Sequence, residues 1–101
     1  MLFYALCLVL GLNMKKLTAT VYIDRLHMAP CAEIASRVID LDCEVWFTYK
    51  DKKINCKSIT SLFLANLYFG DKITIFFEGK DADIAKERLS KYFNDIEEMF
   101  L

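Results

Sequence analysis

The feature that most constrains the fold of this 101-residue chain is how the spacing of its apolar residues changes along the sequence. Four segments have apolar residues at about every second position, as half-buried strands do: residues 17–24, 45–49, 54–56 and 73–77. Three others have them at helical spacing: residues 31–39, 59–67 and 81–100. The predicted order is therefore strand, helix, strand, strand, short helix, strand and long helix.

This order fits an α+β open-faced sandwich, a four-stranded antiparallel sheet covered on one face by three helices. A turn over residues 50–53 would join the second and third strands as a hairpin, although it lacks the Asn-Gly or Asp-Gly pair typical of such turns. A chain of this length forms one domain and can bury a hydrophobic core.

The first 13 residues differ from the rest. Residues 2–12 form an uncharged apolar run about eleven residues long, whereas a membrane helix needs about twenty. No basic segment precedes this run and no small-residue cleavage site follows it, as a secretory signal would require. We expect residues 1–13 to be an extension outside the fold, which a misassigned start codon would explain, and residues 14–101 to form the domain. We also expect a cytoplasmic protein without stable membrane insertion.

Charge and cysteine usage exclude several classes of function. The net charge of −1 provides no basic stripe for nucleic acid. The four cysteines, Cys7, Cys31, Cys43 and Cys56, form no C-x-x-C pair and are expected to be reduced thiols in the core. His27 and Cys31 stand four apart and could share a metal, but no second pair completes a site. We therefore expect neither a metal nor a cofactor.

The candidate functional site surrounds the only histidine and the only proline, His27 and Pro30. Proline is favoured in the first turn of a helix, so His27 should lie just outside a helix N-terminus. Unpaired backbone N–H groups and the positive end of the helix dipole make such a terminus an anion site. A neutral imidazole near pH 7 can attack phosphorus. His27 is thus a candidate phosphoryl carrier, with the amides of Met28 and Ala29 ahead of the phosphate.

From Lys15 to Phe100 the chain resembles the histidine-containing phosphocarrier (HPr) family of the bacterial sugar phosphotransferase system. The family signature Gly-[Leu/Ile]-His-x-Arg-Pro-[Ala/Ser] stands here as Arg25-Leu26-His27-Met28-Ala29-Pro30-Cys31, in which leucine, histidine and proline match. A second signature, Lys-Ser-Ile, is intact as Lys57-Ser58-Ile59, and Gly70 and Gly79 fall where the family has glycines.

The resemblance implies that His27 accepts a phosphoryl group from enzyme I and passes it to sugar-specific enzyme IIA proteins. It implies that Ser58 is a regulatory phosphorylation site for an ATP-dependent serine kinase, in addition to the N-cap role that its position predicts. Ile59 and Phe63 match the family's apolar docking patch. The family's sheet order would place the first strand beside the strand at residues 73–77, with the hairpin on the other side of that strand.

Ala29 stands where the family has an arginine that can neutralise phosphate oxygens. Arg25, two residues before His27, could reach the same space and act in its place. The alternative function is a regulatory or adaptor protein that keeps the fold and acts through Ser58 and the short-helix surface without efficient phosphotransfer.

Three aromatic residues, Tyr22, Trp46 and Phe76, are predicted on the open face of the sheet, on strands that the family topology places side by side. A row of rings this large suggests that something covers it. A homodimer partner could do so, or the apolar run of residues 1–12 could fold back over it. In a third explanation each ring lies flat against neighbouring aliphatic stems.

Overall fold

A computed structural model describes residues 14–21, 28–68 and 70–100 of the chain. Its elements follow the predicted order: β1 (Met14–Thr20), α2 (Met28–Val38), β2 (Glu44–Tyr49), β3 (Lys52–Asn55), α3 (Ile59–Ala65), β4 (Lys72–Glu78) and α4 (Ala82–Phe100). The extension expected at residues 1–13 lies outside the described residues.

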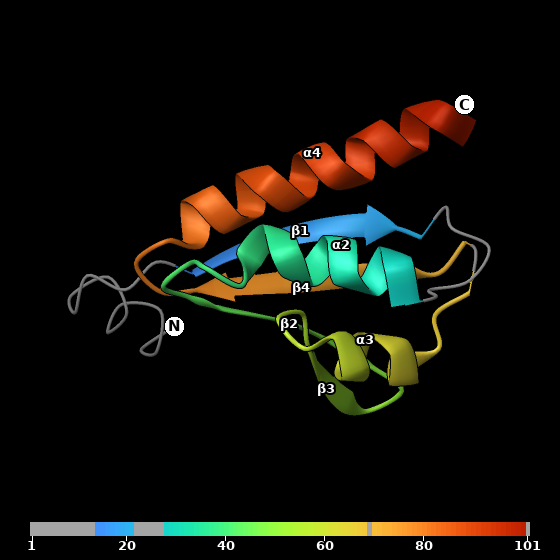
Figure 1. Cartoon of the computed structure of the whole chain (residues 1–101), viewed down its shortest axis with the longest axis horizontal. Coiled ribbons are helices and arrows are strands. Elements are labelled where there is room, and N and C mark those ends of the chain that lie inside the picture. Colours follow the sequence, from blue (N-terminus) through green and yellow to red (C-terminus); the bar gives the residue numbers. More distant parts are fainter. Residues whose placement is uncertain (1–13, 22–27, 69, 101) are drawn as a thin grey trace.

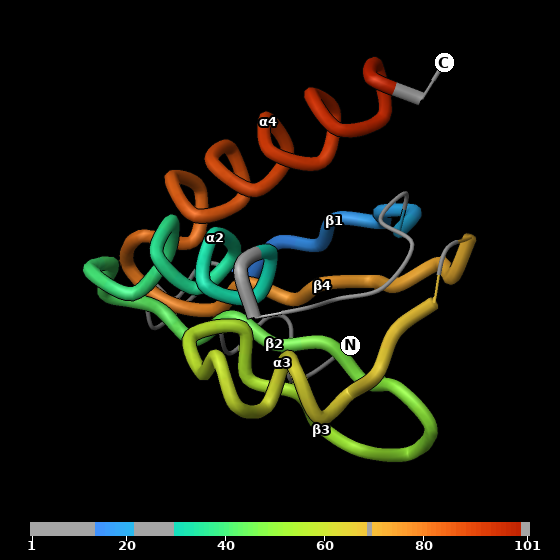
Figure 2. The backbone as a smooth tube through the Cα atoms, turned by 45° about the vertical axis from the view of Figure 1, so that its right-hand side comes forward, coloured from blue at the N-terminus to red at the C-terminus, as the bar shows by residue number. Residues whose placement is uncertain are grey.

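The four strands form one antiparallel sheet in the order β1-β4-β2-β3. All three helices lie on the same face of this sheet (Figures 1 and 2). Both the predicted fold class and the predicted neighbours of β4 are therefore confirmed. Within the described ranges, no helix is long and apolar enough to cross a membrane.

The first strand begins earlier than its apolar pattern predicted. β1 pairs with β4 from Met14 opposite Glu78 to Thr20 opposite Lys72, so the predicted start at residue 17 was three residues late. The two lysines that obscured this start are accommodated because β1 is an edge strand: Lys16 is exposed, and Lys15 Nζ lies 3.4 Å from Asp83 Oδ1. Val21 already lies beyond the strand, and the rest of the predicted segment, residues 22–24, is outside the described residues.

The hairpin turn is shorter than predicted. Lys50 and Asp51 alone form it, with φ angles of 51° and 64°. Positive φ at both central residues matches the twist of the flanking strands, although it usually selects asparagine or glycine. Lys52 and Lys53 were predicted as turn residues, but they pair with β2. β3 therefore begins two residues before the predicted segment 54–56 and ends one residue before its end. The buried side chain of Ile54 and the backbone pairing fix this register.

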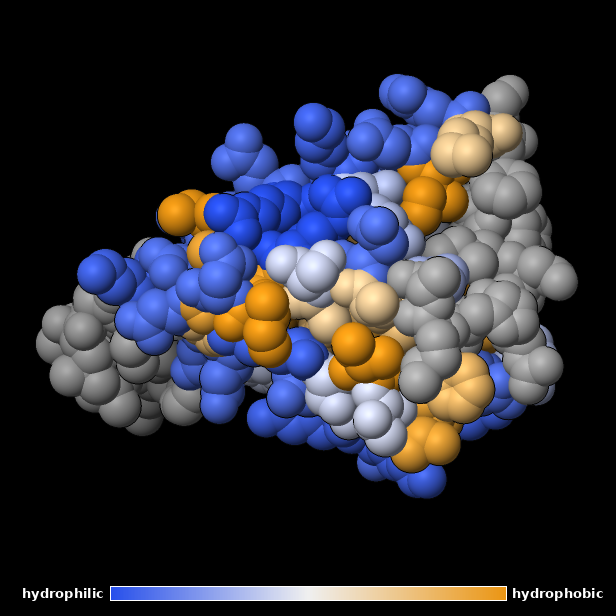
Figure 3. Space-filling model, in the orientation of Figure 1, coloured by the Kyte–Doolittle hydropathy of each residue, from blue (hydrophilic) through white to orange (hydrophobic). Residues whose placement is uncertain are grey.

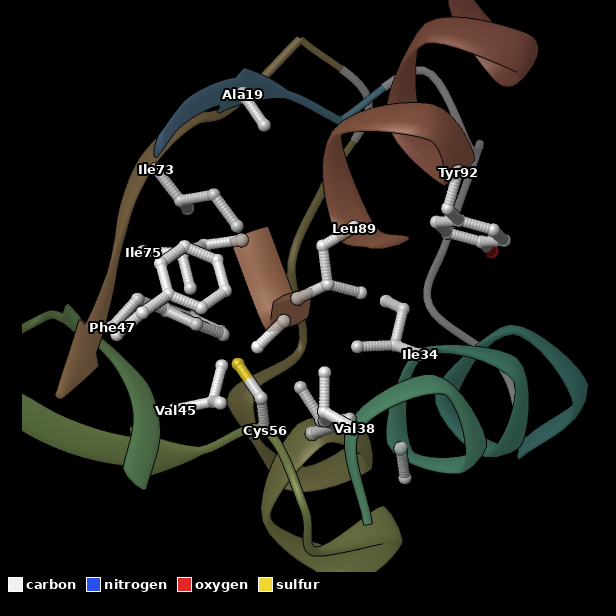
Figure 4. Packing of buried hydrophobic residues seen from close by; sticks show 14 of the residues in the cluster. Ala19, Ile34, Val38, Val45, Phe47, Cys56, Ile73, Ile75, Leu89 and Tyr92 are labelled. Carbon is white, nitrogen blue, oxygen red and sulfur yellow. The ribbon is translucent and has the colours of Figure 1, made fainter. Parts of the chain in front are cut away.

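The core fills the space between the helices and the inner face of the sheet (Figure 4). α2 and α4 bury the faces that their spacing predicted, with one exception: Ile39 follows the last residue of α2 and is 57% exposed, so its predicted burial is wrong. The side chain of Phe100 lies outside the description. Cys31, Cys43 and Cys56 are free and buried, as expected for reduced thiols. Burial raises the pKa of the Cys56 thiol to about 12, which keeps it protonated. Cys7 lies outside the described residues.

The connection from β4 to α4 packs closely against the start of β2. Gly79 has a φ of 134°, and a Cβ at this position would lie 2.9 Å from the Cα of Cys43, so no other residue fits without displacing backbone. Two hydrogen bonds join the same segments: Asp42 N donates to Asp81 Oδ2 at 2.7 Å, and Asp81 N donates to Asp42 O at 3.0 Å. The close approach at Gly79 and these two hydrogen bonds therefore fix this end of the molecule.

The aromatic residues on the open face are covered by lysines of the same sheet. Trp46 and Phe76 pair across β2 and β4 and stack with ring centroids 5.4 Å apart. Lys53 Nζ lies 4.6 Å from the Trp46 ring and Lys16 Nζ lies 5.8 Å from the Phe76 ring. This arrangement supports the third explanation, packing against aliphatic stems. Tyr22 lies outside the described residues, and a homodimer through this face stays a prediction.

Candidate functional site

The candidate site lies at the end of the molecule where β1 ends, α2 begins, α3 ends and β4 begins, on the right of Figure 1. α2 begins at Met28, so Pro30 lies in its first turn, as predicted. The first four N–H groups of a helix have no intrahelical acceptor. Because proline has no N–H, the donors without an intrahelical acceptor among the first three residues of α2 belong to Met28 and Ala29. His27 and Arg25 lie outside the described residues, and their roles stay predictions.

The backbone just before the His27 segment is held by the loop that precedes β4. Val21 N donates to Asp71 O at 2.8 Å, and Val21 O accepts from Gly70 N at 2.6 Å. Gly70 adopts a φ of 91°, a conformation that glycine accepts without strain. This pair of hydrogen bonds fixes the position from which the chain leaves β1 towards His27.

Asp71 connects this loop to the hairpin. Its Oδ2 accepts from Tyr68 N at 2.9 Å and from the Tyr49 hydroxyl at 2.7 Å. These donors, the backbone N–H of Tyr68 first, lower the pKa of Asp71, and the Asp71 hydrogen bond raises the pKa of Tyr49. The sequence analysis missed this role of Asp71. The available signal was Gly70-Asp71 directly before a strand, a pair typical of turns.

The Lys57-Ser58-Ile59 signature starts α3. Ser58 is extended (φ −106°, ψ 113°), and its Oγ accepts from Ser61 N at 3.2 Å, which confirms the predicted N-cap. Lys57 N donates to Asn55 Oδ1 at 2.9 Å, and Lys57 Nζ donates to Leu41 O at 2.6 Å. Lys57 therefore ties the start of α3 to the segment between α2 and β2.

α3 exposes both residues of the predicted docking patch. Ile59 and Phe63 are 40% and 43% exposed, and they lie one turn apart on the same flank. An ordinary amphipathic helix would bury one of these two residues, but the residue that α3 buries is Leu62. Figure 3 shows hydrophobic residues gathered over α2 and α3, whereas α4 presents mainly hydrophilic ones.

A metal site is not supported by the part of the chain that the structure describes. No group of three or more His, Cys, Asp or Glu side chains lies together there. The thiol of Cys31, which stands four residues after His27, is fully buried, and this burial raises its pKa. A metal ligand must be a thiolate, so this environment disfavours coordination by Cys31.

Residues 19–95 match the family model described as the PTS HPr component phosphorylation site. This chain belongs to the HPr family. Two curated relatives are the HPr proteins of Chlamydia muridarum (strain MoPn / Nigg), 29% identical over 69 residues, and Chlamydia trachomatis serovar D, 25% identical over 69 residues. Both alignments cover 68% of this chain but only 66% and 63% of the relatives, slightly less than two thirds of their length.

Solved HPr structures share the fold. HPr-C-His from Thermoanaerobacter tengcongensis has a TM-score of 0.74 at 23% identity, covering 81% of this chain and 93% of that one. The histidine-containing phosphocarrier protein of Mycoplasma also has a TM-score of 0.74, at 26% identity, covering 80% and 93%. HPr from Bacillus anthracis gives 0.66 at 25% identity, covering 82% and 98%. The HPr-like sandwich inferred from the sequence is thus confirmed.

Proposed function

We propose that this HPr-family protein carries a phosphoryl group on His27, accepting it from enzyme I and passing it to an enzyme IIA of the sugar phosphotransferase system. The observation that carries the proposal is the family match over residues 19–95, which contains the single histidine directly before the N-terminus of α2.

The chemistry requires a neutral imidazole and a place for the negative charge of the phosphoryl group. A ring nitrogen of His27 forms a bond to phosphorus as the bond from phosphorus to the donor breaks, and the reverse exchange passes the group to the acceptor. The free amides at the start of α2 face this charge and contribute about 0.3–1 kcal/mol through the helix dipole. Little further covalent chemistry is needed, because phosphoryl transfer depends mainly on positioning and charge stabilisation.

Arg25 is proposed to replace the family arginine that is absent at Ala29. A guanidinium group binds phosphate oxygens with two parallel N–H donors, which alanine cannot supply. The substitution Arg25→Ala should slow phosphorylation of His27, and Arg25→Lys should restore only part of the rate because lysine lacks the forked donors. An unchanged rate in Arg25→Ala would exclude this role.

Ile59 and Phe63 are proposed to contact the partner proteins, since both are apolar and exposed on α3. Ser58 is proposed as the regulatory site of a serine kinase and phosphorylase. Phosphorylation would place about two negative charges on the helix cap next to Lys57 and Ile59, which would change both the local charge and the docking surface.

Incubation with phosphoenolpyruvate and enzyme I tests the main proposal. We expect one acid-labile phosphate per chain, absent from His27→Ala, and transfer to an enzyme IIA. The second candidate function is an adaptor that keeps the Ser58 and α3 surface but does not transfer phosphate efficiently, and the alanine at residue 29 favours it. Absence of labelling together with binding to a serine kinase would establish the adaptor.

A further inference from the structure

A cleft of about 400 Å³ lies between the β2–β3 hairpin and α3. We call it the hairpin cleft. Residues from both elements line it: Tyr49, Lys50, Lys52, Lys53 and Ile54 from the hairpin, and Ser61, Leu64, Ala65 and Asn66 from α3 and its C-cap. The phosphotransfer proposal gives this cleft no role.

The charged side chains lining the hairpin cleft are all lysines. None of the three belongs to an ion pair among the described residues. Lys53 Nζ lies over Trp46, a residue of the open face, at 4.6 Å. Lys50 Nζ lies 5.3 Å from the Tyr49 ring, and Lys52 shares the helix-covered face with Ile54, two residues on. Lys50 and Lys52 are therefore the two lysines of the lining that do not lie over the open face, and Lys50 also helps to lower the pKa of Asp71.

The α3 side of the hairpin cleft adds an apolar contact. Leu64 lines the cleft and is 72% exposed. Ala65 lies beside it, and Ser61 and the αL cap residue Asn66 provide polar groups. An occupant that satisfies this lining must combine negative charge with an apolar side chain. A free inorganic anion would leave Leu64 uncovered.

We propose that the hairpin cleft is a docking surface for an acidic segment of a partner protein, with carboxylates facing Lys50 and Lys52 and an apolar side chain on Leu64. Charge complementarity argues for this occupant. An anionic membrane is less suitable because polybasic membrane segments carry about four to eight basic residues, and a bilayer surface does not enter a cleft.

The hairpin cleft and the proposed phosphotransfer surface use opposite flanks of α3. Ser61 and Ala65 line the cleft, and the helical period places Ile59 and Phe63 about half a turn away from them. An acidic segment in the cleft would therefore leave Ile59 and Phe63 uncovered. The two surfaces can be tested separately.

The probe for this proposal is a synthetic amphipathic peptide of glutamate and leucine, titrated into the isotope-labelled full chain. A matched peptide contains glutamine in place of glutamate. We expect backbone amide shifts confined to residues 50–54 and 61–66, weakened by added salt. The double variant Lys50→Glu/Lys52→Glu should raise the Kd about tenfold, since two surface charge pairs are reversed.

The double variant Lys80→Glu/Lys91→Glu is the matched control, because both lysines are exposed, lie outside the cleft and give the same change in net charge. It should leave the Kd within about twofold. Equal binding of the glutamine peptide, an equal loss in the control, or binding to anionic vesicles but not to the peptide would overturn the proposal. Leu64→Ser gives a second test without a charge change, and it should also weaken binding. Phosphorylation of His27 should not change in these variants, so failure of either proposal leaves the other testable.

Discussion

The two flanks of α3 differ in chemistry although they belong to one seven-residue helix. One flank presents Ile59 and Phe63, both apolar and without a charged residue between them on the helix surface. The other presents Leu64 beside the lysines of the hairpin. Both flanks are open because α3 buries a single residue, so most of its side chains remain available to other molecules.

Three features allow this short helix to form. Leu62 is its only buried residue, Ser58 caps its first turn, and Asn66 ends it with φ 55° and ψ 50°, the left-handed conformation common at helix C-termini. An isolated helix of this length would not be stable in water. The following predictions test how each feature supports the two flanks.

Leu62→Ala should lower the free energy of unfolding more than any other change proposed for α3. Leu62 is fully buried, and truncating a buried leucine to alanine costs about 2–5 kcal/mol. Because both flanks depend on this anchor, phosphotransfer and peptide binding should weaken together. Chemical denaturation measures the loss, and Leu64→Ala is the matched control, since the same truncation at an exposed position should stay within about 0.5 kcal/mol. Equal losses in the two variants would show that Leu62 is not the anchor.

Asp71→Asn should cause the next largest loss of stability, about 1–2 kcal/mol in the free energy of unfolding at pH 7. The carboxylate of Asp71 accepts two hydrogen bonds at a partly exposed position. The pKa of Asp71 is lowered in the folded state, so its contribution is complete above the unfolded pKa of about 3.9 and is lost as the pH falls through the folded pKa.

The difference in the free energy of unfolding between wild type and Asp71→Asn should therefore be larger at pH 7 than at about pH 2, as denaturation at the two pH values would measure. Asp95→Asn, at an exposed position of α4, serves as the control for the loss of one charge. If the difference in the free energy of unfolding between wild type and Asp71→Asn did not change with pH, the ionised carboxylate of Asp71 would contribute nothing to stability.

Ser58→Ala should cost about 1 kcal/mol, the usual loss for removing an N-cap. Ser58→Asp should be close to wild type in stability, because aspartate is an equally good cap. Ser61→Ala lies in the same helix without a capping role and should change stability by less than about 0.5 kcal/mol. If Ser58→Ala and Ser61→Ala unfold at the same denaturant concentration, the cap does not hold α3.

The smallest change in stability, within about 0.5 kcal/mol, is expected for Phe63→Ser and Leu64→Ser, since both side chains are exposed. These variants separate the flanks most directly. Phe63→Ser should slow phosphoryl transfer and leave peptide binding unchanged, while Leu64→Ser should do the reverse. Loss of both activities in either variant would show that the flanks are one surface.

Strand and helix positions were largely predictable because side-chain spacing reports which face of an element is buried. The errors fall where another force decides the boundary. β1 begins at Met14 because its backbone pairs with β4, although Lys15 and Lys16 hide the apolar pattern. The hairpin turn consists of Lys50 and Asp51 because strand pairing imposes left-handed conformations that these residues do not favour by themselves.

The candidate site was predictable only in part. Pro30 marked the start of α2 and Ser58 marked the start of α3, because capping and first-turn preferences act locally. Asp71 was missed because two of its partners, Tyr49 and Val21, lie far from it in the sequence. The hairpin cleft was missed for the same reason, since its lysines and Leu64 meet only after α3 packs against β3.

The sequence by itself therefore determined the order of elements, the fold class, the buried faces of α2 and α4, and the place of the single histidine before a helix. These depend on the spacing of neighbouring residues and on local capping. Only the tertiary structure decided the short hairpin turn, the Asp71 hydrogen bonds, the lysine cover of Trp46 and Phe76, and the two flanks of α3. These depend on residues far apart in the chain, which become neighbours only when the helices pack on the sheet.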